Sequence, residues 1–223
     1  MNGYKAEFIE FLVEANALQF GEFTLKSGRL SPYFFNSSLF DDGPSLERLG
    51  HFYAEAARDL DPACRLIFGP AYKGIPLAVA AAMALSKLCN EPAGYFFNRK
   101  EAKTHGDKGI LVGRSPVETD HVIMVDDVIT DGLTKRESIK MLQQLVPAKY
   151  TGVIIAVDRM ESNSEGKDSR EEFEKDTGVP VRAVVTIDEI CEHLLGREIN
   201  GKVVMTEENH AKIQAYLGKF KVR

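Results

Sequence analysis

Two adjacent carboxylates, Asp126 and Asp127, stand between an apolar run and a short turn that opens into a helical pattern. The run, Val122 to Val125, is short and rich in β-branched residues, which is typical of a strand buried on both faces of a parallel sheet. In open α/β sheets the ligand crevice lies just outside the carboxyl ends of the strands. We therefore expect both carboxylates at that edge, where they can accept hydrogen bonds from the vicinal hydroxyls of a ribose.

The turn that follows, Thr130 to Gly132, presents backbone N–H groups at a helix N-terminus, where a phosphate is favoured. We therefore interpret the segment from His121 to Ser138 as a device that holds a sugar at one end and a phosphate at the other. The alternative is that the aspartate pair merely ends a strand and that Asp131 caps the next helix. Taken alone, the motif does not decide between the two interpretations.

The motif resembles the phosphoribosyl-diphosphate (PRPP) signature of the type I phosphoribosyltransferases, and the resemblance extends over nearly the whole chain. A PRPP motif alone would indicate only the superfamily, whereas SPYFFN together with RKEAKTHG is similar to its orotate branch, in the bacterial single-domain form. The segments that carry the resemblance are FGEFTLKSGRLSPYFFN at Phe20–Asn36, FGPAYKGIPLA at Phe68–Ala78, FNRKEAKTHGDKG at Phe97–Gly109, the aspartate motif, and VDR at Val157–Arg159.

The resemblance implies an α/β fold, the type I phosphoribosyltransferase fold, with a central and mainly parallel sheet flanked by helices. We expect a single domain over residues 1–223, with a small N-terminal hood at about 1–40 and a mobile catalytic loop at about 99–120. The hydrophobic pattern agrees, because strands alternate with helices as in βαβ units. Strands are predicted at Arg65–Phe68, Gly94–Phe97, Val122–Val125, Gly152–Val157 and Arg182–Ile187, and helices at 8–15, 46–60, Ile75–Leu88, Leu133–Leu145, Arg170–Thr177 and after an N-cap at Thr206, with LSPYFFN as a hairpin or extended piece.

Two polar stretches lack a regular pattern. Ala102 to Asp120 is predicted to be an irregular, mobile lid, and Glu161 to Arg170 a solvated surface loop. Displacing pyrophosphate builds negative charge on the leaving group, and cations on a closing loop stabilise that charge. By resemblance, the loop closes over the neighbouring subunit's site, which implies a homodimer with shared sites. The cations that would contact the pyrophosphate are Arg99, Lys100, Lys103 and His105, and the alternative for them is a solvated charge run.

A second strand-to-helix loop, Phe68 to Gly74, contains glycines that permit close approach of the backbone to a ligand. Lys73 in this loop adds a point charge that suits pyrophosphate. The family often has a non-proline cis peptide within Ala71–Lys73, a bond that the sequence cannot locate. Without the resemblance, such a loop would be interpreted as an ordinary βα turn.

The nucleobase end is predicted from the SPYFFN segment. Orotate is flat and carries a carboxylate, so its site needs in-plane backbone groups and a cation. The resemblance places the base against the backbone of Phe34 and Phe35, its carboxylate edge near Arg159 and Thr130, and Lys26 near PRPP. The alternative is that the two phenylalanines are core residues.

The expected reaction is Mg²⁺-dependent transfer of the 5-phosphoribosyl group from PRPP to orotate, giving orotidine 5′-monophosphate and pyrophosphate in pyrimidine (UMP) biosynthesis. Asp126 and Asp127 are expected to serve the ribose hydroxyls and not to ligate the metal directly. By resemblance, the catalytic residues are Lys103, His105, Arg99, Lys100, Lys73 and Asp127. The substrate-binding set is Lys26, Phe34, Phe35, Tyr72, Lys73, Arg99, Lys100, Lys103, His105, Asp126, Asp127, Val128, Ile129, Thr130, Asp131, Gly132, Leu133, Thr134 and Arg159.

The chain departs from the family's pattern at Asp131 and Leu133, where the family usually has a small residue and a hydroxyl residue. A carboxylate near a phosphate repels it, so we expect weaker PRPP binding than in a relative with a small residue. Asp131 could instead point away as an N-cap or pair with Lys135 four residues on.

Composition narrows the remaining functions. A net charge of −5 and a pI near 5.6 argue against nucleic-acid and membrane partners. Three cysteines without metal-type spacing and the lack of an export or membrane signal favour a reduced, cytoplasmic location. Two other functions stay open: a phosphoribosyltransferase for another base, and a noncatalytic nucleotide sensor on the same scaffold.

Overall fold

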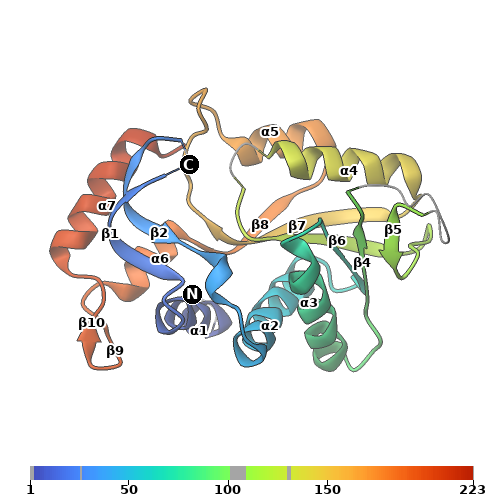
Figure 1. The fold of residues 1–223 in the computed structure, drawn as a ribbon, viewed down its shortest axis with the longest axis horizontal. Helices are drawn as coiled ribbons and strands as arrows, with labels where there is room; N and C mark the ends of the chain where they lie inside the picture. The colour runs from blue at the N-terminus through green and yellow to red at the C-terminus, as the bar shows by residue number, and fades with distance from the viewer. Residues whose placement is uncertain (1–2, 26, 101–108, 130–131, 223) are drawn as a thin grey trace.

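The structure, a computed structural model, describes residues 3–25, 27–100, 109–129 and 132–222. A six-stranded sheet in the order β5-β4-β3-β6-β7-β8 forms its centre, and helices cover both faces (Figure 1). Neighbouring strands are parallel except for β5, which pairs antiparallel with β4 at one edge. The prediction of a mainly parallel sheet is confirmed. The strands are β3 (Leu66–Gly69), β4 (Gly94–Asn98), β5 (Leu111–Gly113), β6 (His121–Asp126), β7 (Lys149–Asp158) and β8 (Val181–Thr186).

The central strands are apolar on both faces because each face has its own helical layer. In β6, Ile123 and Val125 belong to the core beneath α2 (Gly43–Leu60) and α3 (Gly74–Cys89). Val122 and Met124 point to the other face, into the core beneath α4 (Leu133–Leu145) and α5 (Ser169–Thr177). Side chains alternate along a strand, so a strand that lies between two cores must be apolar at every position.

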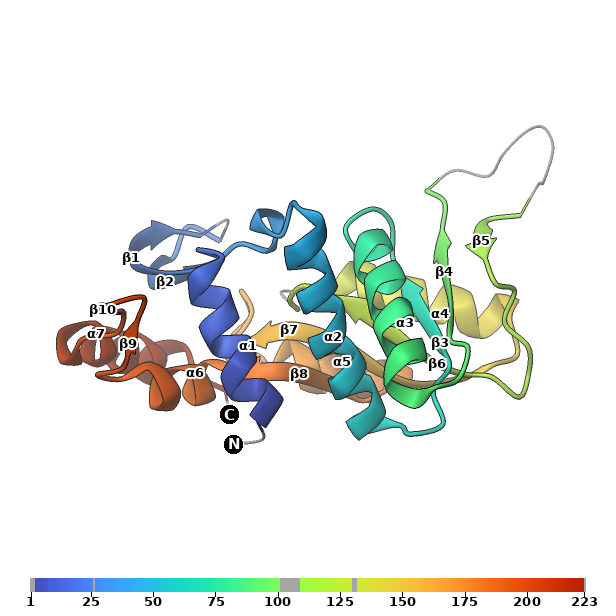
Figure 2. The same cartoon turned by 90° about the horizontal axis from the view of Figure 1, so that it is seen from below.

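A smaller layer lies beside the sheet. The hairpin of β1 (Leu18–Thr24) and β2 (Leu30–Phe35) is antiparallel and pairs Leu18 with Phe35. The C-terminal helix α7 (Glu207–Phe220) packs against β2, so elements from both ends of the chain form this layer (Figures 1 and 2). The remaining elements are α1 (Gly3–Glu14), the 3₁₀ turn η1 (Ser37–Leu39), α6 (Ile187–Leu194), β9 (Glu198–Ile199) and β10 (Lys202–Val203).

Several local predictions need correction. Part of the stretch predicted to be irregular forms β5, because its short apolar patch pairs with the edge strand β4. The last strand of the sheet ends at Thr186 and not at Ile187, because Thr186 caps α6 in a capping box with Glu189. The helix α6 and the strands β9 and β10 were not predicted.

The polar loop from Glu161 to Arg170 is largely exposed between residues 164 and 167, as predicted for a solvated loop. It is also attached to the hairpin, because Arg29 donates to the carbonyl oxygens of Ser162 and Asn163 at 2.7 and 2.8 Å. Within the part of the chain that the structure describes, no helix has both the length and the apolar character needed to cross a membrane.

Close packing of α2 on α3 depends on Gly50. A Cβ atom at this position would lie 2.6 Å from the backbone carbonyl of Ala80, a separation that forces the helices apart. We expect Gly50→Ala to lower the free energy of unfolding by about 1–3 kcal/mol, the usual cost of overpacking. Chemical denaturation measures this change. Gly43→Ala on the same helix has open space around its Cβ and is the matched control; equal stability of both variants would contradict the expectation.

Candidate active site

Asp126 ends β6 at the carboxyl edge of the sheet, as predicted, and both of its carboxylate oxygens have protein partners. Its Oδ1 accepts from the backbone N–H of Asp127 at 2.9 Å, and its Oδ2 lies 2.6 Å from Nζ of Lys135. From the opposite face of the sheet, the hydroxyl of Tyr53 donates to the backbone carbonyl of Asp126 at 2.7 Å. Burial raises the pKa of Tyr53, so this hydroxyl stays protonated and keeps donating. Asp126 is therefore fixed from α2 and from α4.

Asp127 accepts three hydrogen bonds. Its Oδ2 accepts from Oγ of Ser37 at 2.8 Å and from Nζ of Lys73 at 3.1 Å, and its Oδ1 accepts from the backbone N–H of Val128 at 2.8 Å. Burial acts to raise the pKa of Asp127, but donation from Ser37 and Lys73 outweighs it and the pKa is lowered. Burial raises the pKa of Asp126, and the positive charge of Lys135 offsets this rise only in part. The two neighbouring carboxylates therefore have pKa shifts of opposite sign.

The loop before α3 brings Lys73 to this edge. A Cβ on Gly69 would lie 2.0 Å from the carbonyl oxygen of Gly74, so the loop can close on itself only with glycine there. The peptide bond between Ala71 and Tyr72 is cis, which locates the bond that the sequence left open. The N–H of Ala71 donates to Oδ1 of Asn98 at 3.0 Å, which ties this loop to the end of β4. A cavity of about 160 Å³ beside the loop is lined in part by Ser37, Lys73 and Asp127.

Two of the four predicted loop cations lie within the described residues. Nζ of Lys100 is 4.8 Å from the centre of the Tyr72 ring, and that ring is 67% exposed. Nε of Arg99 is buried and has no hydrogen-bond partner among the described residues. Lys103 and His105 lie outside them, as does Lys26. The structure thus brings Lys100 and Tyr72 together above the same loop as Lys73.

The turn predicted to hold phosphate leads into α4. Gly132, with φ of 69°, is the N-cap residue, and no side chain caps the helix there. Thr130 and Asp131 lie outside the described residues. Leu133 is 53% exposed, and Thr134 is also exposed. Lys135, which the sequence offered as a partner for Asp131, lies on the side of α4 that faces the sheet and contacts Asp126.

At the other end of the site, Arg159 follows β7 and is held in one orientation. Its Nε and Nη2 donate to Oε1 of Glu161 at 2.9 and 2.7 Å, and Nη2 also donates to Oγ of Ser31 at 3.1 Å. The guanidinium lies over the Tyr33 ring, 4.7 Å from its centre. Nη1 has no hydrogen-bond partner among the described residues. One edge of the guanidinium is therefore occupied by protein, which leaves Nη1 as its remaining donor nitrogen.

Glu161 is itself anchored by two tyrosines. Tyr33 on β2 donates to its Oε1 at 2.7 Å, and Tyr216 on α7 donates to its Oε2 at 2.9 Å. These bonds join the C-terminal helix to the arginine.

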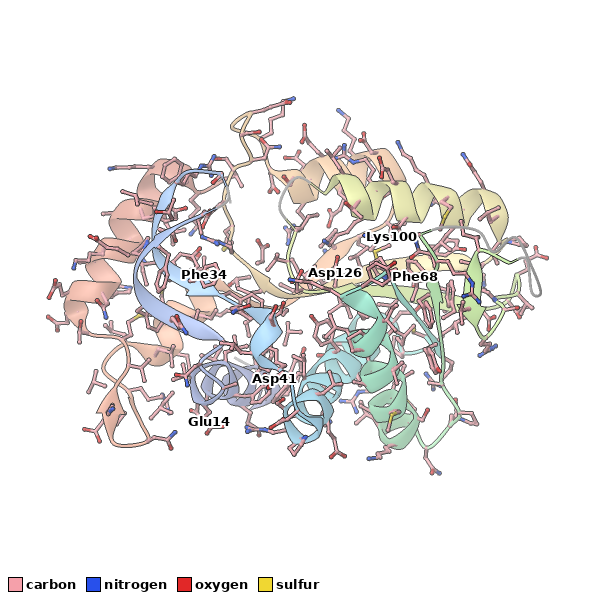
Figure 3. All side chains as sticks on the ribbon, viewed as in Figure 1. Glu14, Phe34, Asp41, Phe68, Lys100 and Asp126 are labelled. Carbon is pink, nitrogen blue, oxygen red and sulfur yellow. The ribbon has the colours of Figure 1, made fainter. Side chains whose placement is uncertain are left out.

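The two predicted phenylalanines differ in burial. Phe35 is buried, whereas Phe34 is half-buried and stacks on Phe23 with ring centres 5.5 Å apart. Among the strands that the structure describes, β2 pairs with β1 alone, so alternate residues of β2 turn their backbone N–H and C=O groups away from the partner strand. Such groups can contact a flat base in its plane. In the view of Figure 3, Asp126 lies between Phe34 on one side and Lys100 on the other.

This arrangement has three adjoining parts: an anion-binding arginine beside an open strand edge, a pair of carboxylates, and a cationic loop.

Comparisons of the sequence with known proteins are consistent with such a site. An orotate phosphoribosyltransferase of Lachnoclostridium phytofermentans is 42% identical over 225 residues, covering 100% of this chain and 99% of the relative. One of Methylococcus capsulatus is 47% identical over 196 residues, covering 88% of this chain and 91% of the relative. The chain belongs to the orotate phosphoribosyltransferase family.

The fold of the present chain supports its assignment to this family. The crystal structure of the orotate phosphoribosyltransferase of Francisella tularensis superimposes with a TM-score of 0.81 at 35% identity, covering 96% of this chain and 99% of that one. No family model matches the chain.

Sequence reasoning missed several residues of the orotate phosphoribosyltransferase site. Ser37 immediately follows the SPYFFN segment and Glu161 stands two residues after Arg159, so their closeness to predicted residues could have indicated them. Asn98 and Lys135 likewise adjoin the predicted residues Arg99 and Thr134. Tyr53 and Tyr216 give no comparable signal, because only the packing of distant elements brings them to the site.

Proposed function

We propose that this chain transfers the 5-phosphoribosyl group of PRPP to N1 of orotate, giving orotidine 5′-monophosphate and pyrophosphate in UMP biosynthesis. The observation that carries the proposal is the carboxylate pair at the end of β6, set between the lysines of a cationic loop and an arginine with one free edge. The relatives with this name match the chain over its full length, which also supports the activity.

The pyrophosphate end is assigned to Lys73 and Lys100, together with Arg99, Lys103 and His105. In the reaction the bond between C1 of the ribose and the pyrophosphate oxygen breaks, and its electron pair leaves with the pyrophosphate. Lys73 and Lys100 stabilise the charge that develops there. The ribose hydroxyls donate to Asp126 and Asp127, which positions C1, and the 5-phosphate binds at the N-terminus of α4, where Gly132 is the N-cap residue.

The base end is assigned to Arg159 and β2. Nη1 of Arg159 donates to the carboxylate of orotate, while backbone groups at Phe34 and Phe35 contact the ring edge. N1 of orotate is readily made anionic, and its lone pair forms the new bond to C1. The protein therefore needs to orient the base and does not need a strong general base.

Magnesium fits this site as a cation bound mainly through the substrate. Within the described part of the chain, no group of three or more His, Cys, Asp or Glu side chains could hold a metal by itself. Asp126 and Asp127 offer hard carboxylate oxygens that already accept from protein groups, and Mg²⁺ typically binds through one or two carboxylates plus substrate oxygens and water. When bound, Mg²⁺ would neutralise negative charge on the pyrophosphate oxygens.

The purified chain, given PRPP and Mg²⁺, should consume orotate, measured as loss of orotate absorbance. Uracil, adenine and hypoxanthine in parallel reactions test the alternative base specificities. We expect rapid turnover of orotate, far slower turnover of uracil, and no turnover of either purine. Turnover of a purine in its place would contradict the orotate assignment, and binding of PRPP without turnover of any base would favour the sensor.

Ser31 contributes one acceptor to the orientation of Arg159. Its Oγ is buried and accepts from Nη2 at 3.1 Å. Arg159 keeps both bonds to Glu161 in the variant, so we take the net loss as that of one ordinary hydrogen bond, about 1 kcal/mol. We therefore expect Ser31→Ala to raise the KM for orotate about 5-fold and to leave the KM for PRPP unchanged. Steady-state kinetics with each substrate varied measures both constants. Ser164→Ala, in an exposed loop, is the control, and an equal rise in both KM values would argue against this role.

We further propose a homodimer in which the loop at about 99–120 completes the partner's site. A groove of about 920 Å³ between α2 and α3 is lined largely by apolar side chains, including Met83, which is 61% exposed. Such an apolar surface suits burial against a second copy. Light scattering should give twice the chain mass of 24.8 kDa.

A cytoplasmic location is supported by three free thiols, two of them buried.

A further inference from the structure

Two lysines contact the two adjacent carboxylates, but they do so from environments that differ sharply. Lys73 reaches Asp127 from a loop, and its side chain is 65% exposed. Lys135 reaches Asp126 from the first turn of α4, and its side chain is only 11% exposed. An exposed lysine can change partners at little cost, whereas a buried lysine cannot leave its carboxylate without leaving a buried charge unpaired.

The hydrogen-bond capacity of the two carboxylates differs in the same way. An ionised carboxylate offers about four lone-pair positions. Asp126 uses two of them, for the N–H of Asp127 and for Lys135, and so keeps two for the vicinal hydroxyls of a ribose. Asp127 accepts from Ser37, Lys73 and Val128, so its capacity for a ligand increases only when Lys73 leaves.

We propose that Lys135 is a positioning residue for PRPP. Lys135 holds Asp126 ionised and directed at the ribose hydroxyls, while Lys73 is free to move with the pyrophosphate. The proposal rests on the proposed role of Asp126 at the ribose. It assigns the two lysines different functions: Lys135 stays on its carboxylate throughout the reaction, and Lys73 exchanges Asp127 for the leaving group.

The position of Lys135 also links two subsites. The same helical turn begins at Gly132, next to the turn assigned to the 5-phosphate, and carries the side chain that fixes the ribose carboxylate. The start of α4 therefore contributes to both the proposed phosphate subsite and the ribose subsite.

The first test replaces Lys135 by methionine, which has a similar length and no charge. Calorimetry with PRPP and Mg²⁺ in the absence of orotate should show a Kd for PRPP that is raised about 10- to 100-fold. The KM for orotate at saturating PRPP should change less than 3-fold, because a general loss of structure would affect both substrates. Lys140→Met lies on the same helix with its side chain exposed, and its Kd should equal that of the wild type.

A double-mutant cycle keeps the proposal testable where Lys135→Met folds poorly. The double variant Asp126→Asn with Lys135→Met leaves no unpaired charge at this pair of positions. Its Kd for PRPP is compared with that of the single variant Asp126→Asn. Since Lys135 acts through Asp126, the two variants should bind PRPP with the same Kd within about 2-fold. A Kd at least 10-fold weaker in the double variant would mean that Lys135 touches PRPP directly, and would overturn the positioning role.

The outcomes for the inference and for the proposed function are separable. Equal affinity of the wild type and a folded Lys135→Met variant would overturn the inference alone. Failure of the wild type to bind PRPP would overturn the proposed function, and the inference with it.

Discussion

Replacing Lys73 by methionine is expected to lower kcat by about 100- to 1,000-fold, the usual loss when one donor to a developing anion is removed. Lys73 is the more exposed of the two lysines that contact the carboxylate pair: its Nζ lies 3.1 Å from Asp127, and its side chain is 65% exposed. The loss should appear in kcat because charge on the pyrophosphate grows as the bond to C1 breaks. Steady-state kinetics with PRPP and orotate measures it.

The variant should remain folded. Asp127 keeps its bonds from Ser37 and Val128, and an exposed ion pair stabilises a protein by about 1 kcal/mol or less. Lys212→Met is the matched control, because this lysine is exposed on α7 and pairs with Glu208. If kcat stayed within 3-fold of the wild type while only the KM for PRPP rose, Lys73 would bind the ground state and would not act on the leaving group.

Replacing Arg159 by methionine is expected to raise the KM for orotate about 100-fold, with little change in the Kd for PRPP. The 100-fold rise in KM corresponds to the loss of a charge-assisted hydrogen bond to the orotate carboxylate, which is worth about 1.5–3 kcal/mol. Glu161 keeps its two tyrosine donors, so the substitution does not leave that carboxylate unpartnered.

Comparison with uracil, which lacks the carboxylate, makes this prediction sharper. The ratio of kcat/KM for orotate to that for uracil should fall by the same factor in Arg159→Met, because only the orotate reaction uses the arginine. Arg197→Met, an exposed arginine paired with Glu10, should leave the ratio unchanged. An unchanged ratio in Arg159→Met would place the orotate carboxylate elsewhere.

Local sequence predicted the parts of the site that are continuous in the chain. The alternation of apolar residues and the abrupt change to two aspartates located both β6 and its functional end, and the glycines of the loop before α3 located the turn that carries Lys73. These signals are readable because strand burial and tight turns restrict residue type within a few positions.

Other features depend on contacts between distant segments. Lys135 stands in an otherwise ordinary helical pattern, and nothing near it in the sequence shows that it faces Asp126. Tyr216 reaches Glu161 across 55 positions, and Tyr53 reaches Asp126 across 73. The strand β5 has only three residues, too few to give a clear alternation, and it forms because β4 offers an unpaired edge.

A crystal structure of the wild-type chain with orotidine 5′-monophosphate tests the central claim most directly. We predict that the orotate carboxylate contacts Nη1 of Arg159, that the ribose hydroxyls contact Asp126 with Lys135 still in place, and that the phosphate lies at the N-terminus of α4. A nucleotide bound elsewhere, such as in the groove between α2 and α3, or a base that does not approach Arg159, would contradict the assignment of this site.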